Sequence, residues 1–153
     1  MTSETFTGET TAESQSSKAA AEAMLANFKR LWDSLNPEIV KEMVAPDATA
    51  FWSGVGEFRG SDYPEQMQQT MAAVPDAKME VVDHAIEMPY LFISWILRGT
   101  FAGEAVEING IDRFRLRGEL ADNVWAIFDT GPMREQLARG AQGSGQAEAP
   151  SAA

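Results

Sequence analysis

The sequence contains no cysteine and only one histidine, His84. A chain without thiols forms no disulfide, no thiolate metal site and no cysteine nucleophile. One imidazole is too few for a histidine-rich metal centre, so we expect neither a metal nor a cofactor. No apolar run approaches the roughly 18–20 residues that a membrane-spanning helix needs. We therefore expect no membrane partner.

Basic side chains are also scarce, because 12 Lys and Arg stand against 23 Asp and Glu and leave a formal net charge of −11. Nucleic acids and anionic lipid surfaces both attract clustered positive charge, so this balance argues against either as a partner. The acidic N-terminus lacks the basic and apolar regions of a secretory signal and the arginines of a transit peptide. We expect a cytoplasmic protein.

The length of 153 residues suits one domain. Residues 1–17 are rich in Thr, Ser and Glu, and residues 140–153 are rich in Gly, Ala and Ser. Segments of such composition bury too little apolar surface to fold. We therefore expect a disordered acidic tail over 1–17, a structured domain over 18–139 and a disordered Gly/Ala-rich tail over 140–153.

Helical periodicity comes first in this domain, and strand patterns follow it. Helices are expected over 18–32, 37–44 and 63–73, and short strands over 49–52 and 57–59. Further strands are expected over 79–88, 90–98, 100–106, 108–116 and 124–129. This order predicts an α+β fold in which three N-terminal helices pack on one curved antiparallel sheet.

Strand alternation gives one acidic residue an unusual environment. Asp112 shares a strand face with Phe114 and Leu116. The opposite face carries Arg113, Arg115 and Arg117. Burying a carboxylate on an apolar face costs roughly several kcal/mol unless it is paired or neutral. Asp112 is therefore a candidate catalytic acid, although an aspartate near a strand start can also simply bind backbone amides or an arginine.

Two further ionisable residues are candidates. Alternation places His84 on the apolar face of the strand 79–88, and its unperturbed pKa of about 6.5 suits proton transfer near neutrality. The alternative is a satisfied histidine of the core or pocket. Asp129 ends the last strand and either joins the site or caps the turn that follows. Both faces of 124–129 are apolar, which leaves open which of them is buried.

Several short motifs occur in a characteristic order: Pro46-Asp47-Ala48-Thr49, a turn at Gly60, Val74-Pro75-Asp76, Arg98-Gly99-Thr100 and Gly110-Ile111-Asp112-Arg113-Phe114-Arg115. Together with the helices, over about residues 20–136, they resemble the nuclear transport factor 2-like superfamily, in particular its SnoaL-like polyketide cyclases and ketosteroid isomerases. The resemblance implies a cone, in which the curved sheet wraps over the helices and encloses one apolar pocket. Such pockets usually bind small molecules.

The resemblance also bears on single residues. Ile111-Asp112-Arg113-Phe114-Arg115 is similar to the ketosteroid isomerase segment that carries the oxyanion-hole aspartic acid, which implies that Asp112 faces the pocket. Phe28 stands at the isomerase tyrosine position and Trp52 at the general-base position. Neither can perform those roles, so steroid isomerisation by the usual apparatus is not expected. The acid–base set of the related epoxide hydrolases is not matched either.

From these considerations, the candidate catalytic residues are Asp112, His84 and Asp129. The candidate substrate-binding residues are mostly aromatic: Phe28, Trp32, Trp52, Tyr63, Trp95, Phe114 and Trp125. We expect a cofactor-independent acid–base enzyme, namely a cyclase, isomerase or lyase that acts on an enolisable apolar ring compound such as a polyketide, steroid, terpenoid or aromatic metabolite. The alternative is a non-catalytic binding or dimerisation module of the same fold.

The expected partners are an apolar small-molecule substrate and a second copy of the chain. The resemblance implies a homodimer that forms through the outer face of the sheet. The arginine face of 112–117 would lie there, and self-association at a net charge of −11 needs local charge compensation.

Overall fold

The computed structural model describes the backbone of residues 3–139 and the side chains of residues 18–139. The elements follow one another in this order: α1 (Ser3–Ser34), the 3-10 helix η1 (Pro37–Glu42), β1 (Val44–Trp52), β2 (Gly56–Arg59), the 3-10 helix η2 (Gly60–Asp62), α2 (Tyr63–Ala73), β3 (Lys78–Glu87), β4 (Tyr90–Phe101), β5 (Glu104–Arg117) and β6 (Leu120–Phe128). A last helix covers residues 131–139. The helices expected over 18–32 and 63–73 are present, and the helix expected over 37–44 is a short 3-10 helix, η1.

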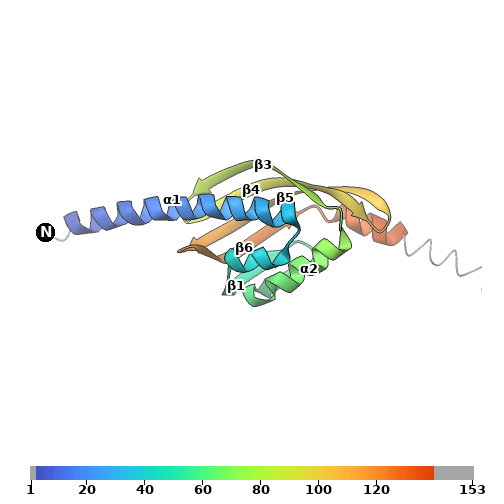
Figure 1. Cartoon of the computed structure of the whole chain (residues 1–153), viewed down its shortest axis with the longest axis horizontal. Coiled ribbons are helices and arrows are strands. Elements are labelled where there is room, and N and C mark those ends of the chain that lie inside the picture. Colours follow the sequence, from blue (N-terminus) through green and yellow to red (C-terminus); the bar gives the residue numbers. More distant parts are fainter. Residues whose placement is uncertain (1–2, 140–153) are drawn as a thin grey trace, which may run out of the picture.

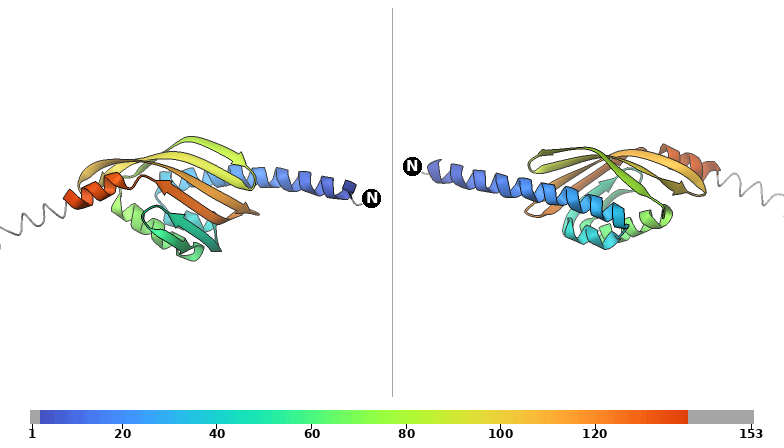
Figure 2. Two further views of the ribbon diagram at one scale, coloured as in Figure 1. Left: turned by 180° about the vertical axis from the view of Figure 1, so that it is seen from behind. Right: turned by 45° about the horizontal axis from the view of Figure 1, so that its top comes forward.

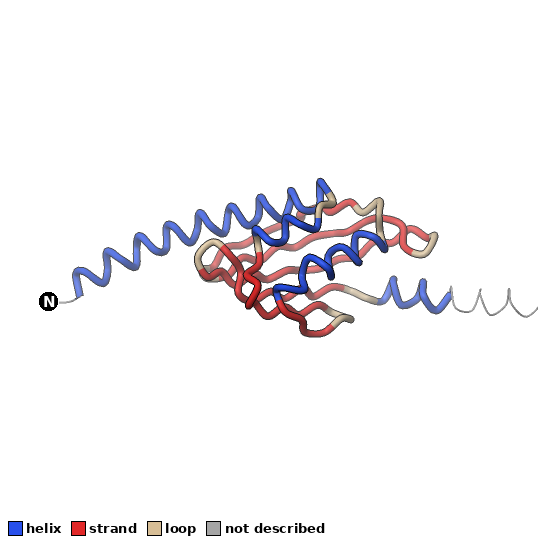
Figure 3. Tube along the Cα trace, turned by 60° about the horizontal axis from the view of Figure 1, so that its bottom comes forward, coloured by secondary structure: helices blue, strands red, loops and turns tan. Residues whose placement is uncertain are grey.

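All six strands form one curved sheet in the order β2-β1-β6-β5-β4-β3 (Figure 1). The helices α1, η1 and α2 lie on the same face of this sheet (Figure 3), which confirms the α+β class and the cone. The expectation of a purely antiparallel sheet is wrong, because β1 pairs with β6 in the parallel sense. β3, β4, β5 and β6 form an antiparallel meander, and its last strand, β6, lies beside β1.

The core lies between the helices and the inner face of the sheet. On α1, the positions with helical spacing, among them Met24, Phe28 and Leu31, are almost fully buried. From the sheet, β4 contributes Leu91 and Ile93, which are fully buried. The inner face of β5 is the one with Phe114, and that of β6 is the one with Val124 and Ala126.

The strand expected over 100–106 is divided by a turn, and its second part is continuous with the strand expected over 108–116. The hairpin turn falls at Ala102 and Gly103, both with positive φ, and β5 then runs unbroken through Asn109 and Gly110. Gly110 does not interrupt the strand. The space that a side chain at this position would need is occupied by the indole of Trp95. A Cβ atom there would lie 2.3 Å from Cζ2 of Trp95, so the indole of Trp95 packs directly against the backbone of Gly110.

Two of the sequence motifs meet in space. Asp76, in the turn after α2, accepts hydrogen bonds from the backbone N–H and the hydroxyl of Thr100 on β4, both at 2.8 Å. These bonds hold the pKa of Asp76 below its usual value. Gly99 allows the close approach, since a Cβ there would be 2.4 Å from Val74. The contact holds the C-terminal end of α2 against the sheet.

The two ends of the described chain extend in opposite directions. The first half of α1 projects beyond the sheet, and the helix 131–139 continues from the far end of β6 (Figure 2). The backbone from Ser3 onward is helical, so the structure gives no support to a tail without structure over the whole of 1–17. The tail expected over 140–153 lies outside the described residues. Within residues 3–139, no helix is long and apolar enough to cross a membrane.

Candidate functional site

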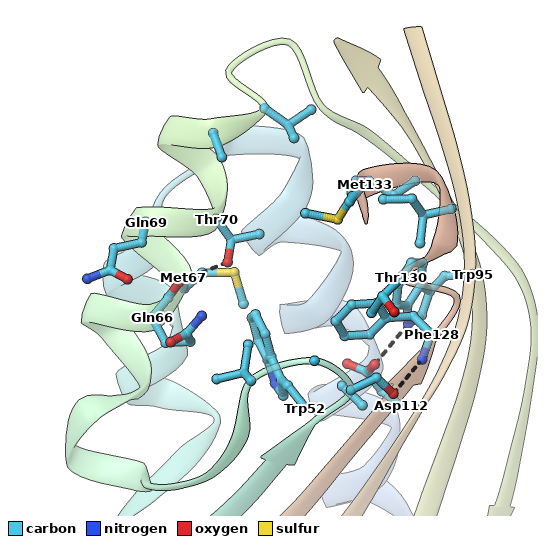
Figure 4. A pocket seen from close by; sticks show the side chains of 18 of the residues that line it. Trp52, Gln66, Met67, Gln69, Thr70, Trp95, Asp112, Phe128, Thr130 and Met133 are labelled. Carbon is cyan, nitrogen blue, oxygen red and sulfur yellow. Dashed lines mark hydrogen bonds between the residues drawn. The ribbon is translucent and has the colours of Figure 1, made fainter. Parts of the chain in front are cut away.

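The described chain encloses a main cavity with a volume of about 350 Å³. It lies between the inner face of the sheet, α2 and the helix 131–139 (Figure 4). Its walls are aromatic and aliphatic, with Trp32 from α1, Trp52 from β1, Trp95 from β4 and Phe128 from the end of β6. Cavities of this size and character typically bind small molecules.

Asp112 is the one acidic residue that lines this cavity. It lies on the inner face of β5, between Ile93 of β4 and Ala126 of β6, and only 7 % of it is exposed. Its Oδ1 accepts a hydrogen bond of 2.9 Å from Nε1 of Trp95. Within residues 18–139, no other group forms a hydrogen bond with this carboxyl. The second oxygen is therefore available to a ligand in the cavity.

The position of Trp95 follows from the sheet register. Trp95 pairs with Gly110, two residues before Asp112 on β5. Because Gly110 has no side chain, the indole lies over it and Nε1 reaches the carboxyl of Asp112. Burial raises the pKa of Asp112 to about 7, and the Trp95 hydrogen bond opposes this rise. Near neutral pH the carboxyl is therefore present in both forms, and it can donate a proton as well as accept one.

A second aromatic group connects the cavity wall, through Trp52, to Tyr63 behind it. Nε1 of Trp52 donates a hydrogen bond of 3.0 Å to the hydroxyl of Tyr63, and the two rings pack edge to face with centroids 5.6 Å apart. Burial, together with the nearby charge of Asp112, raises the pKa of Tyr63 well above its usual value. Tyr63 therefore stays protonated, and its own O–H remains a potential donor close to Asp112.

Three of the expected substrate-binding residues lie deeper than the main cavity. Phe28, Tyr63 and Phe114 line a second void of about 10 Å³, which Asp112 also borders. The rings of Phe28 and Phe114 pack edge to face, with centroids 6.3 Å apart. Phe28 therefore fills core volume at the isomerase tyrosine position. The phenol nearest to Asp112 comes from α2 instead, as Tyr63.

Trp125, by contrast, does not line either cavity. On β6 the buried face is the one with Val124 and Ala126, so the expectation that Trp125 contacts a ligand in the pocket is wrong. Trp125 is 45 % exposed on the outer face of the sheet, where the guanidinium of Arg113 lies 4.0 Å from its ring centroid. Both strand faces are apolar, and only the packing of the helices on one of them decides which is buried.

His84 does not face the cavity either. It pairs with Ile93, but β3 is an edge strand and His84 is exposed. Because paired residues on neighbouring strands share a face, His84 lies on the same side of the sheet as the buried Ile93, as alternation predicts, but it is not part of the cavity lining. Side chains on an edge strand have a neighbouring strand on one side only, so water reaches His84 in spite of the apolar sequence around it.

Asp129 is also exposed and outside the cavity lining. Its Oδ1 accepts a 2.9 Å hydrogen bond from the N–H of Gly131, the first residue of the helix 131–139. The capping alternative is thus the one that the geometry matches. Of the three candidate catalytic residues, the structure brings only Asp112 into the cavity.

The sequence interpretation missed the helix 131–139 and its contribution to the site. This helix places Met133, Arg134 and Leu137 at the cavity. Thr70 of α2 lies on the opposite wall from Met133 (Figure 4). An available signal was Asp129 followed by Pro132, which is typical of a capped helix start. Across residues 18–139, no group of three or more His, Asp or Glu side chains is arranged to hold a metal ion.

Comparison with known proteins gives a consistent result. Residues 22–137 match the model of the SnoaL-like polyketide cyclase family. No curated protein matches the chain. Among solved structures, IdmH from Streptomyces antibioticus, a candidate polyketide cyclase, is 21% identical with a TM-score of 0.66, over 77% of this chain and 98% of its own.

Two other solved structures have the same fold. A ketosteroid isomerase-like-fold protein from Catenulispora acidiphila is 14% identical with a TM-score of 0.66, over 74% of this chain and 90% of its own. An epoxide hydrolase from M. tuberculosis is 13% identical with a TM-score of 0.64, over 80% of this chain and 92% of its own. The family match spans most of the domain that carries the cavity and Asp112, and this chain belongs to the SnoaL-like polyketide cyclase family.

Proposed function

We propose that this protein is a cofactor-independent acid–base enzyme that acts on an enolisable apolar ring compound, as a SnoaL-like cyclase, isomerase or lyase. The observation that carries the proposal is a single buried carboxyl, Asp112, in the wall of an aromatic cavity with its pKa raised to about 7. A proton carrier with a pKa close to the working pH is the most efficient general acid or base.

The chemistry follows from the two forms of this carboxyl. As a carboxylate, Asp112 removes the proton on the carbon next to a substrate carbonyl, and the electron pair of that C–H bond moves into the enolate. The carboxyl group, now neutral, returns the proton to another carbon in an isomerisation. In a cyclisation, the enolate carbon instead attacks a second carbonyl, and the neutral carboxyl protonates the resulting alkoxide.

The surroundings of Asp112 support this role. Trp95 occupies one carboxyl oxygen through its indole N–H and so holds the group in one orientation. The protonated hydroxyl of Tyr63 lies behind Asp112, where both residues border the small void, so it adds no negative charge beside the carboxyl. Trp52 and Trp95 offer flat apolar surfaces for a ring.

A direct test uses 2-tetralone, an enolisable bicyclic ketone, as the probe. Its α-protons exchange in D₂O, and NMR measures the rate with and without protein. We expect the wild type to accelerate the exchange and Asp112→Asn to reduce the acceleration by about 10²-fold or more. Asp83→Asn, which changes an exposed carboxyl on β3, is the matched control and leaves the rate unchanged.

The alternative is a non-catalytic binding module. In its favour, Phe28 and Trp52 occupy the positions of the isomerase tyrosine and base, and both side chains pack into the aromatic interior. A wild type that binds 2-tetralone but exchanges its protons no faster than Asp112→Asn would favour this alternative over the enzyme.

We also propose that the chain forms a homodimer through the outer face of the sheet. Ile111, Trp125 and Ile127 lie together there, each between 45 % and 51 % exposed. Solvent-exposed apolar patches of this kind often mark protein interfaces. Arg113, stacked on Trp125, adds positive charge to the patch and reduces the repulsion between two acidic copies.

A further inference from the structure

Only two charged side chains line the main cavity of the described chain, and they lie at different depths. Asp112 is buried in the sheet wall. Arg134 is exposed and comes from the first half of the helix 131–139. The other exposed residues of the lining surround the same opening: Gly54, Val55, Gln69, Ala73 and Leu137. Arg134 therefore lies at the mouth and Asp112 at the inner end.

Arg134 differs from most of the other arginines of the described chain, and from Arg59, which is also without an ion pair there, in lining the cavity. Most of these have a carboxylate partner: Arg30, Arg98, Arg115, Arg117 and Arg139 each form an ion pair. Arg113 is stacked on Trp125. Within residues 18–139, Arg134 forms neither an ion pair nor a side-chain hydrogen bond, and it is the one cation of the cavity lining. In a chain with a net charge of −11, an unpaired guanidinium at such a place is conspicuous.

We propose that Arg134 binds an anionic group of the ligand, so that the preferred ligand is an apolar ring compound that carries a carboxylate at its outer end. The inference rests on the proposed function, because it takes the same cavity as the substrate site. The carboxylate pairs with the guanidinium at the mouth, while the ring enters the aromatic interior and its enolisable carbon approaches Asp112.

The choice of a carboxylate follows from geometry and charge. A guanidinium presents two parallel N–H groups, which match the two oxygens of a carboxylate. The acidic protein repels a dianion such as a phosphate monoester more strongly than a monoanion. The separation of the two charges also suits one ligand orientation, because a carboxylate placed at the inner end would meet Asp112 and lose its counter-ion.

The test compares two ligands that differ only in charge, 2-naphthylacetate and its neutral amide, 2-naphthylacetamide. Isothermal titration calorimetry at pH 6 and low salt measures the affinity of each. We expect the wild type to prefer the carboxylate by about fivefold, as for a partly exposed ion pair, and added salt to reduce the preference.

The variants locate the preference. Arg134→Gln should abolish the preference for the carboxylate over the amide, whereas Arg134→Lys should keep part of it. Arg59→Gln is the matched control, because Arg59 is exposed, forms no ion pair within residues 18–139 and lies outside the cavity lining. It removes the same charge and should keep the full preference.

The outcomes separate this inference from the function on which it rests. Equal affinity of the wild type for both ligands, or a preference that survives in Arg134→Gln, would overturn the role of Arg134 alone. Proton exchange that depends on Asp112 would still stand in that case. If neither ligand binds the wild type, the inference fails as well, while the exchange of 2-tetralone protons decides the proposed function separately.

Discussion

The raised pKa of Asp112 affects the stability of the fold as well as the proposed chemistry. Its pKa is about 7 in the folded protein because burial penalises the charged form, whereas an unfolded aspartate has a pKa near 3.8. The folded state therefore holds this proton more tightly than the unfolded state. The contribution of Asp112 to stability is therefore most favourable below about pH 4. It falls as the pH rises from the unfolded pKa of 3.8 to the folded pKa of about 7, with no further loss above that value.

This linkage predicts the behaviour of Asp112→Asn. The amide keeps the shape and can still accept the Trp95 hydrogen bond, but it needs no proton to be neutral. We expect its free energy of unfolding, relative to wild type, to be higher at pH 8 than at pH 5 by on the order of 1–4 kcal/mol. Urea denaturation at the two pH values measures this difference. An identical difference at both values would show that Asp112 ionises normally in the folded protein.

Gly110 is the second residue whose local chemistry has a large effect. A methyl group there would lie 2.3 Å from the indole of Trp95, so Gly110→Ala must push the ring off β5. We expect a loss of about 1–3 kcal/mol in the free energy of unfolding and a broken hydrogen bond between Trp95 and Asp112. Denaturation experiments measure the first effect and the Nε1–H resonance of Trp95 reports the second.

The double variant Gly110→Ala/Trp95→Phe tests the explanation. Because phenylalanine is smaller than tryptophan, the alanine should cost less stability in the Trp95→Phe background than in the wild type. Equal costs in both backgrounds would mean that Trp95 is not the group that the methyl meets.

At the scale of elements, the helix 131–139 forms one side of the cavity and is attached to the sheet by two polar side chains. Gln136, which is 5 % exposed, donates a hydrogen bond of 2.9 Å from Nε2 to the carbonyl of Ala102 in the β4–β5 turn. Arg139 pairs with Glu104 on the same hairpin, at 3.0 Å. These two side chains connect the helix to the sheet and so position Met133 and Arg134 at the cavity.

Gln136→Ala should therefore loosen this helix without unfolding the domain. We expect faster amide hydrogen exchange in residues 131–139, while β4 and β5 remain protected. Hydrogen–deuterium exchange with mass spectrometry distinguishes the two regions. Glu135→Ala, an exposed neighbour on the same helix, is the control and should leave the exchange as it is. Equal exchange in the two variants would assign the closure to other contacts.

At the scale of the whole molecule, the outer face of the sheet is the largest feature that the cavity does not explain. The apolar side chains of Ile111, Trp125 and Ile127 form its centre. If two copies meet there, Trp125→Glu should place two new negative charges in the interface and convert the dimer to a monomer. Light scattering after size exclusion measures the mass of each form. A wild type that is a monomer at all concentrations would refute the homodimer.

The local parts of this structure could be predicted because short-range physics determines them. Alternation correctly places Asp112, Phe114 and Leu116 on one face, and helical spacing correctly locates the buried stripe of α1. For His84 alternation gives the correct face, opposite the buried Ile93, but it does not reveal that β3 is an edge strand on which this side chain stays exposed. It left Trp125 open because both faces of its strand are apolar. An unpaired edge and a second apolar face are properties of the assembled sheet, which a local pattern does not contain.

By itself, the sequence determined the order of the elements, the α+β class, the absence of thiol chemistry and the placement of one carboxyl on an apolar face. Periodicity and composition carry that information residue by residue. Only the tertiary structure decided that β1 joins β6 in parallel, that Trp95 reaches Asp112 across Gly110, and that Arg134 shares a cavity with Asp112. These relations join residues far apart along the chain, so they exist only once the sheet has curled around its helices.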